Sequence, residues 1–172
     1  MDNREWVKVH LMCGINTKVV SSVEISGWEA HDSPYFKPLV ETTARHFRVH
    51  EVSADKAYPS RKNLAAVEAA GGTPYIPFKE NMAASSLDEE SMWAKMYHQY
   101  AFNREAFLGH YHKRSNAETA FSMIKDKFGD AVRSKSDTAQ VNEVLCKVLC
   151  HNICVVAMAG HELGIEPTFR IA

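Results

Sequence analysis

The sequence of 172 residues lacks any uninterrupted apolar run of 18 or more residues, any internal repeat and any low-complexity segment. Polar residues interrupt its longest apolar region, Val144 to Ala159, so the sequence predicts no membrane span. The first five residues lack the basic and then apolar pattern of a signal peptide, which indicates a cytoplasmic protein. Length and composition, with 45% hydrophobic and 24% charged residues, predict a single domain over residues 1–172.

Cysteine is scarce, and the four cysteines do not match a secreted disulfide framework. Cys146, Cys150 and Cys154 recur every four residues along one expected helix, with His151 beside them, so a zinc site is one interpretation. The favoured interpretation is that these thiols are small buried hydrophobes. They would then share an apolar stripe with four aliphatic neighbours, Val144, Leu145, Leu149 and Ile153.

An excess of charge of one sign is also absent, because the chain has 20 Lys and Arg residues and 21 Asp and Glu residues, which gives a net charge of −1. This balance argues against a protein that binds polyanions indiscriminately over its whole surface. Residues 104–135, however, include seven basic residues and four acidic ones. The sequence therefore predicts one modest basic patch, with a local charge of +3.

Hydrophobic periodicity and turn residues predict an α/β chain. The expected strands are 6–13, 18–26, 51–54 and 73–78, and the expected helices are 32–47, 61–70, 87–99, 103–113 leading into 115–128, and 138–160. The first two strands are expected to form an antiparallel hairpin over residues 6–26. A sheet-containing part, 5–78, is then followed by a connection at 81–86 and by a helical part, 87–160.

The most informative segment carries Tyr111, Arg114, Glu118 and Lys125 with the spacing Tyr-x2-Arg-x3-Glu-x6-Lys. On one α-helix these offsets bring the four side chains within about 60° of one another. Such a face is suited to bind a phosphodiester and a metal ion, and the alternative is a solvated face with short-range ion pairs. The other side of this helix carries an apolar stripe that is expected to be buried, formed by Ala117, Ala120, Phe121, Ile124 and Phe128.

This spacing resembles the signature of the insertion-sequence transposases with a DDE catalytic centre, in the group named for its Tyr-Arg-Glu-Lys helix. Asp55, which follows an apolar strand and has Tyr58 three residues on, is similar to the second aspartate of that family. Lys8 and His10 are similar to its Lys-x-His strand. The resemblance covers about residues 5–157, nearly the whole chain.

The resemblance implies an RNase H-like mixed sheet with flanking helices, and DNA cleavage and strand transfer that use two Mg²⁺ or Mn²⁺ ions. It makes Asp55 and Glu118 catalytic metal ligands, and Tyr111, Arg114 and Lys125 ligands of DNA phosphates. Asp55 could instead cap a turn, and Tyr111 could be a helix–helix contact. The implied partners are double-stranded DNA, as transposon ends and target, and further copies of the enzyme in a homo-oligomeric complex in the cytoplasm, at the nucleoid.

The sequence shows no counterpart of the family's first, central strand, which carries the first catalytic aspartate. The chain is therefore expected to correspond to the C-terminal portion of the catalytic domain, and to leave the hairpin and the strand at 51–54 paired directly or separated by a gap. It is also expected to be inactive alone, unless Asp2, Asp32 or Glu51 replaces the missing acid. One alternative is a truncated or domesticated remnant that binds DNA or a partner subunit without cutting. Another is an RNase H-like nuclease or resolvase, against which the phosphate-binding spacing argues.

Overall fold

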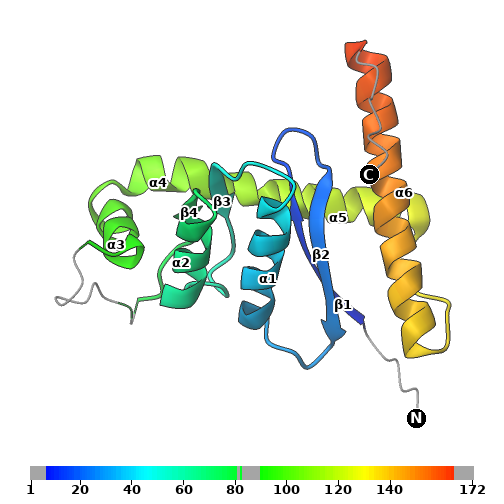
Figure 1. The fold of residues 1–172 in the computed structure, drawn as a ribbon, viewed down its shortest axis with the longest axis horizontal. Helices are drawn as coiled ribbons and strands as arrows, with labels where there is room; N and C mark the ends of the chain where they lie inside the picture. The colour runs from blue at the N-terminus through cyan, green and yellow to red at the C-terminus, as the bar shows by residue number, and fades with distance from the viewer. Residues whose placement is uncertain (1–6, 81, 83–89, 165–172) are drawn as a thin grey trace.

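The computed structural model describes residues 7–80, 82 and 90–164 (Figure 1). Asp2 and most of the connection expected at 81–86 lie outside the described residues. The α/β class is confirmed. The strands are β1 (Val7–Cys13), β2 (Val20–Gly27), β3 (Glu51–Ser53) and β4 (Thr73–Tyr75). The helices are α1 (Ser33–Ala44), α2 (Arg61–Ala69), α3 (Met92–Phe102), α4 (Arg104–Tyr111), the 3-10 turn η1 (His112–Arg114), α5 (Ser115–Phe128) and α6 (Asp137–Leu163).

The predicted hairpin is confirmed, because β1 and β2 pair antiparallel with Val7 opposite Gly27. Its turn is tied to α5, since the Lys18 ammonium donates to the side-chain oxygen of Asn116. On the other side β2 docks on α1, where the buried Ser22 hydroxyl donates to the Leu39 carbonyl at 2.9 Å. The hairpin is therefore fixed between two helices (Figure 1).

The strands β3 and β4 pair in parallel, with Glu51 opposite Thr73 and α2 as the crossover between them. Gly72 leads into β4 in close contact with its neighbours, since a Cβ atom there would lie 2.9 Å from Val49 Cγ1. β4 ends at Tyr75, three residues earlier than expected. Pro77 explains this difference, because proline has no amide hydrogen to donate to a neighbouring strand.

One mixed sheet was expected, and the described residues form two separate two-stranded sheets instead. No hydrogen-bonded pairing joins β1 to β3 in this part of the chain, so a gap separates them. Both strands line a cavity of about 220 Å³ that fills the space between them. Of the two outcomes expected for the hairpin and the strand at residues 51–54, separation by a gap is therefore the one observed.

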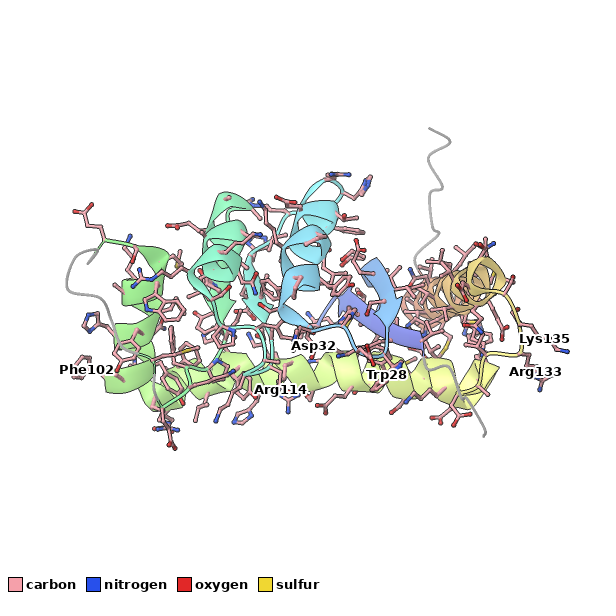
Figure 2. All side chains as sticks on the ribbon, turned by 90° about the horizontal axis from the view of Figure 1, so that it is seen from below. Trp28, Asp32, Phe102, Arg114, Arg133 and Lys135 are labelled. Atoms are coloured by element: carbon pink, nitrogen blue, oxygen red, sulfur yellow. The ribbon has the colours of Figure 1, made fainter. Side chains whose placement is uncertain are left out.

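A long helical rod, α4–η1–α5, runs along the molecule beneath both sheets (Figures 1 and 2). A continuous helix was expected from Tyr111 to Lys125, but Tyr111 ends α4 and a 3-10 turn precedes α5. The Asn116 side chain gives a reason, because it donates to the Lys113 carbonyl at 2.7 Å within the tightened turn. The apolar stripe of α5 faces inward as expected, with Ala120 and Ile124 buried and Ala117, Phe121 and Phe128 half-buried.

Helix α6 docks through a narrow face that consists of Val144, Val148, His151 and Val155. The His151 Nε2–H donates to the carbonyl of Lys18 at 2.9 Å. The Asn152 side chain accepts from the backbone amide of Val20 and donates to its carbonyl, both at 2.8 Å. These polar contacts fix α6 against the start of β2.

The predicted burial of the cysteine stripe is wrong. Cys146 and Cys150 are exposed, and Cys154 is half-buried. The reason is that α6 contacts the body through the valine face, which leaves the adjacent apolar face in solvent, with Leu145, Leu149 and Ile153 at 41%, 59% and 58% exposure. By length and composition α6 also meets the criterion for a membrane span, but a single helix of this kind is weak evidence for one.

Candidate active site

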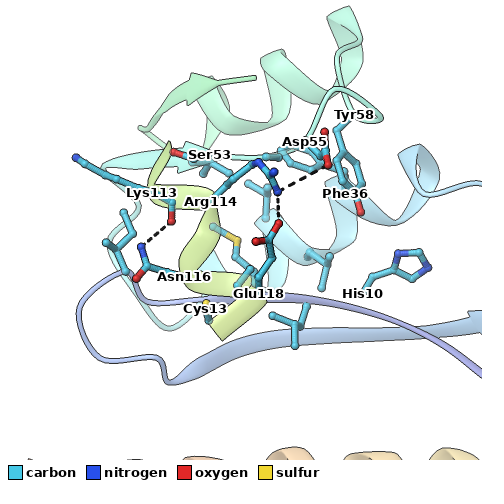
Figure 3. Close-up of a pocket in the computed structure, with 18 of the residues that line it drawn as sticks. His10, Cys13, Phe36, Ser53, Asp55, Tyr58, Lys113, Arg114, Asn116 and Glu118 are labelled. Atoms are coloured by element: carbon cyan, nitrogen blue, oxygen red, sulfur yellow. Dashed lines mark hydrogen bonds and ion pairs between the residues drawn. The ribbon is translucent and has the colours of Figure 1, made fainter. Parts of the chain in front are cut away.

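Three of the predicted site residues meet at the mouth of the cavity (Figure 3). Asp55 follows β3 by two residues, and Glu118 lies in the first turn of α5. Between them lies Arg114 Nη1, at 2.5 Å from Glu118 Oε1 and 3.8 Å from Asp55 Oδ2. Because both oxygens approach the same nitrogen, the two carboxylates are within about 6 Å of each other, a separation that one or two divalent ions can bridge.

The chemistry of this pair suits a hard divalent cation, since both ligands are carboxylates and both are more than half exposed. Asp55 also has a local contact, because its Oδ1 accepts from the backbone amide of the next residue, Lys56, at 2.5 Å. The second oxygen, Oδ2, faces Arg114. Among the residues that the structure describes, no three Asp, Glu, His or Cys side chains gather in one potential metal site. The described part of the chain therefore supplies two carboxylates to this site.

Tyr111 aligns the guanidinium between the carboxylates. Its hydroxyl accepts from Arg114 Nε at 2.9 Å, and its ring lies 5.4 Å from the guanidinium carbon. The ring is half-buried against a cluster of buried hydrophobic side chains that includes Phe107, so the expected phosphate ligand is also a packing residue. Partial burial by itself would lower the pKa of Arg114, but Glu118, Tyr111 and Asp55 together raise it above its ordinary value. Arg114 is thus a permanent cation in the site.

Lys125 is the predicted site residue that the structure does not place with the others. It is exposed near the end of α5, two helical turns beyond Glu118, or about 10 Å along the axis. No contact joins it to Arg114 or Asp55 within the described part of the chain. Lys125 therefore extends the charged face of α5 away from the carboxylate pair.

Lys8 and His10 anchor the hairpin to the start of α1. The Lys8 ammonium pairs with the Asp32 carboxylate, and the buried His10 ring stacks on Tyr35 with ring centroids 4.5 Å apart. His10 Nε2 lies 3.0 Å from the Ser26 hydroxyl. Burial lowers the pKa of His10, although the nearby Asp32 opposes this shift. Asp32 is therefore engaged in an ion pair with Lys8 at the start of α1.

Glu51 fixes the rod to β3, a function that the sequence did not reveal. Its two carboxylate oxygens contact His110 Nδ1 at 2.7 Å and Lys113 Nζ at 2.6 Å. The Ser53 hydroxyl adds a bond to the His110 carbonyl at 2.8 Å. Both carboxylate oxygens of Glu51 are thereby paired with basic side chains. This clamp sets the distance between Asp55, which follows β3, and Arg114, which follows Lys113.

Replacing Glu51 by Gln is expected to destabilise the fold by about 1 kcal/mol at neutral pH, a small value because both cations are partly exposed. Partial burial alone would raise the pKa of Glu51, but the hydrogen bonds from Lys113 and His110 outweigh it and lower this pKa below 4.5. A lowered pKa stabilises the folded state above the unfolded-state pKa, and the stabilisation is lost as the pH falls. Urea unfolding at pH 7 and at pH 3 measures the difference. An equal effect of the substitution at both pH values would contradict the clamp.

The cavity between the sheets is mainly apolar around this charged mouth. Val9, Leu11 and Met12 of β1 line one side, and Val52 and Ala54 line the other. Tyr58 lies at the rim, where burial, together with the charges of Asp32 and Asp55, raises its pKa to about 12. A neutral phenol and an apolar channel between two strand edges thus adjoin the carboxylate pair (Figure 3).

Comparison with known proteins gives two matches that bear on this site. The family model described as "Transposase DDE domain" matches residues 2–153. The protein named "Probable transposase for insertion sequence element ISA1214", from Archaeoglobus fulgidus, is 30% identical over 109 residues, which cover 63% of this chain and 32% of that protein. The chain thus aligns with about a third of the length of this curated relative. No solved structure matches the chain.

Proposed function

Because the chain belongs to the family of transposases with a DDE domain, we propose that Asp55 and Glu118 take part in metal-dependent phosphoryl transfer on DNA. The observation that carries this proposal is the position of both carboxylates around one guanidinium nitrogen. The two residues come from different elements and are 63 positions apart in the sequence, so only the fold brings them together. A solvated helix face would not require a carboxylate from a second element.

Asp55 and Glu118 would hold Mg²⁺ or Mn²⁺, and such ions activate the attacking oxygen and stabilise the leaving oxygen when they are bound. In their absence Arg114 neutralises the two carboxylates. Its planar guanidinium is suited to turn towards a phosphate and bind it with two parallel hydrogen bonds. Tyr111 keeps that guanidinium oriented, and Lys125 contributes a point charge to the DNA backbone further along α5.

The gap between β1 and β3 suggests that the site is completed by a further strand with its own carboxylate. The cavity there has an apolar lining, strand edges on both sides and the carboxylate pair at its mouth. A strand in this position would join the two small sheets into one RNase H-like mixed sheet. The 172-residue chain alone would then be inactive, with two of the three expected carboxylates. In this proposal the chain corresponds to the C-terminal portion of the catalytic domain. The assembled enzyme would act on double-stranded DNA in the cytoplasm, as a homo-oligomer.

A nicking and strand-transfer assay tests the proposed function. The substrate is DNA that carries the ends of the element, with Mg²⁺ or Mn²⁺, and the enzyme is a complete transposase that includes this chain. Cleavage should require the metal and should fall by about a thousandfold or more in Asp55→Asn, because a metal ligand is lost. Asp126→Asn, an exposed acid on α5, is the matched control.

Two results would count against the proposal. Equal cleavage by Asp55→Asn and the control would remove Asp55 from the catalytic centre. Cleavage by the 172-residue chain alone, if it disappears in Asp55→Asn, would show that another acid within this chain completes the site.

A further inference from the structure

The segment between α5 and α6, residues 129–136, has no regular secondary structure, yet its backbone is held by side chains of α6. The Glu143 carboxylate accepts hydrogen bonds from the backbone amides of Arg133, at 3.0 Å, and of Ser134, at 2.9 Å. These bonds, that of Ser134 above all, lower the pKa of Glu143. A half-buried carboxylate is thus engaged with backbone rather than with a basic side chain of this segment.

Lys147, one turn further along α6, holds the beginning of the same segment. Its ammonium donates to the carbonyl oxygens of Gly129, at 3.2 Å, and of Ala131, at 2.7 Å. It also pairs with Glu143 at 3.5 Å. One acid and one base of α6 therefore satisfy four backbone groups of an irregular segment, which we call the braced segment.

The braced segment presents two cations on the same side. Between Ala131 and Lys135 exposed residues alternate with half-buried ones, the pattern of extended backbone in which every second side chain points the same way. Arg133 and Lys135 are both exposed, and Figure 2 shows them projecting from one end of the molecule. In the described part of the chain neither side chain has a hydrogen-bond or ion-pair partner.

The position of this pair relates it to the candidate active site. Arg114 precedes α5 and the braced segment follows it, so the 14 residues of α5 separate the two, about 21 Å along the helix axis. That length corresponds to roughly six base pairs of duplex DNA. Asp130 lies in the braced segment and Asp137 directly follows it, so the positive charge is local rather than broad. A local contact depends on a fixed backbone, which Glu143 and Lys147 provide.

We propose that the braced segment is a second DNA-backbone contact, in which Arg133 and Lys135 bind phosphates of a duplex that lies along α5. Glu143 and Lys147 are positioning residues that hold the two cations in place. This inference rests on the proposed function, because it takes DNA as the substrate of the Arg114 site. It adds a contact outside the predicted Tyr-Arg-Glu-Lys residues.

Fluorescence anisotropy with a labelled mixed-sequence duplex of about three helical turns tests the contact, using the 172-residue chain at several salt concentrations. The double variant R133Q/K135Q should bind about tenfold or more weakly at low salt. The slope of log K against log salt should fall by about 1.8, because each lost phosphate contact accounts for about 0.9. The control K37Q/K62Q removes the same charge from α1 and α2 and should change affinity less than twofold.

The variant Glu143→Gln separates positioning from net charge. Removal of an acid near the DNA should strengthen binding if charge alone matters. A loosened backbone should instead weaken binding several-fold, even though the protein has become more positive. Lys147→Met, which removes the bonds to Gly129 and Ala131, should weaken binding in the same way, beyond the loss shown by a single Lys62→Gln variant.

The binding results distinguish the braced contact from the proposed DNA contact at Arg114. Equal losses in R133Q/K135Q and in K37Q/K62Q, or tighter binding by Glu143→Gln, would overturn the braced contact. If Arg114→Gln weakens binding while R133Q/K135Q does not, only the further contact fails and the proposed site stands. If the unmodified chain does not bind the duplex at all, both the braced contact and the proposed DNA contact of this chain are wrong.

Discussion

Replacing Glu118 by Gln is expected to lower DNA cleavage by a complete transposase that contains this chain by at least about a thousandfold, or about 4 kcal/mol of transition-state free energy. The substitution keeps the size of the side chain and removes the negative charge that holds a divalent ion. Glu118 is 64% exposed, and its only described contact is the ion pair with Arg114, so the fold should be unaffected. Nicking of labelled DNA, measured beside circular dichroism and DNA binding, gives the three readouts.

The matched control for Glu118→Gln is Glu105→Gln, because Glu105 is an exposed acid on α4 of the same rod. DNA binding by Glu118→Gln should be unchanged or tighter, since Arg114 loses a competing partner. If Glu118→Gln cleaves as fast as the control, Glu118 is a surface acid that only pairs with Arg114, and the proposed centre is wrong.

Replacing Arg114 by Ala is expected to have effects of opposite sign on metal binding and on cleavage. Without DNA the guanidinium occupies the position between Asp55 and Glu118, so it competes with a cation for both carboxylates. Its removal should tighten Mn²⁺ binding to the 172-residue chain by about tenfold, because two carboxylates lose their neutralising partner. In the complete enzyme the same substitution should slow cleavage by about a hundredfold or more, because a phosphate ligand is lost.

Electron paramagnetic resonance of free Mn²⁺ measures the first effect, and the nicking assay measures the second. Arg104→Ala is a suitable control, since Arg104 lies over the Tyr100 ring on the same rod and contacts neither carboxylate. Weaker Mn²⁺ binding by Arg114→Ala would mean that the guanidinium organises the carboxylates instead of competing with the metal for them.

The proximity of the candidate site residues could be predicted from the sequence because it depends on short spacings and strand ends. Tyr111, Arg114 and Glu118 are close in sequence, so local helical geometry already places them together. Asp55 could be expected near the site because it follows the end of β3, and ligand-binding side chains of α/β sheets gather where strands end. The gap between the hairpin and β3 was one of two outcomes that the sequence left open, because the pattern of elements contained no strand between them.

Other features depend on tertiary contacts that a single sequence does not specify. The clamp of Glu51 joins it to His110, 59 positions away, and no periodicity signals such a pair. The wrong prediction for the cysteine stripe has a similar cause. Helix α6 is apolar on more than one face, so periodicity could not show whether Val148 or Leu149 would face β2. Lys125 matched the spacing, but seven positions of α5 separate it from Glu118, so it lies about 10 Å further along the helix axis.

The bonds between Asn152 and Val20 have a consequence for the order of folding. They join residues 132 positions apart, so the start of β2 gains this partner only after synthesis has passed Asn152. At ribosomal rates of roughly 5–20 residues per second, this delay is on the order of ten seconds. During synthesis, before α6 forms, the backbone of Val20 at the start of β2 therefore lacks its Asn152 partner. The backbone of Val20 is covered only when Asn152 of α6 binds it.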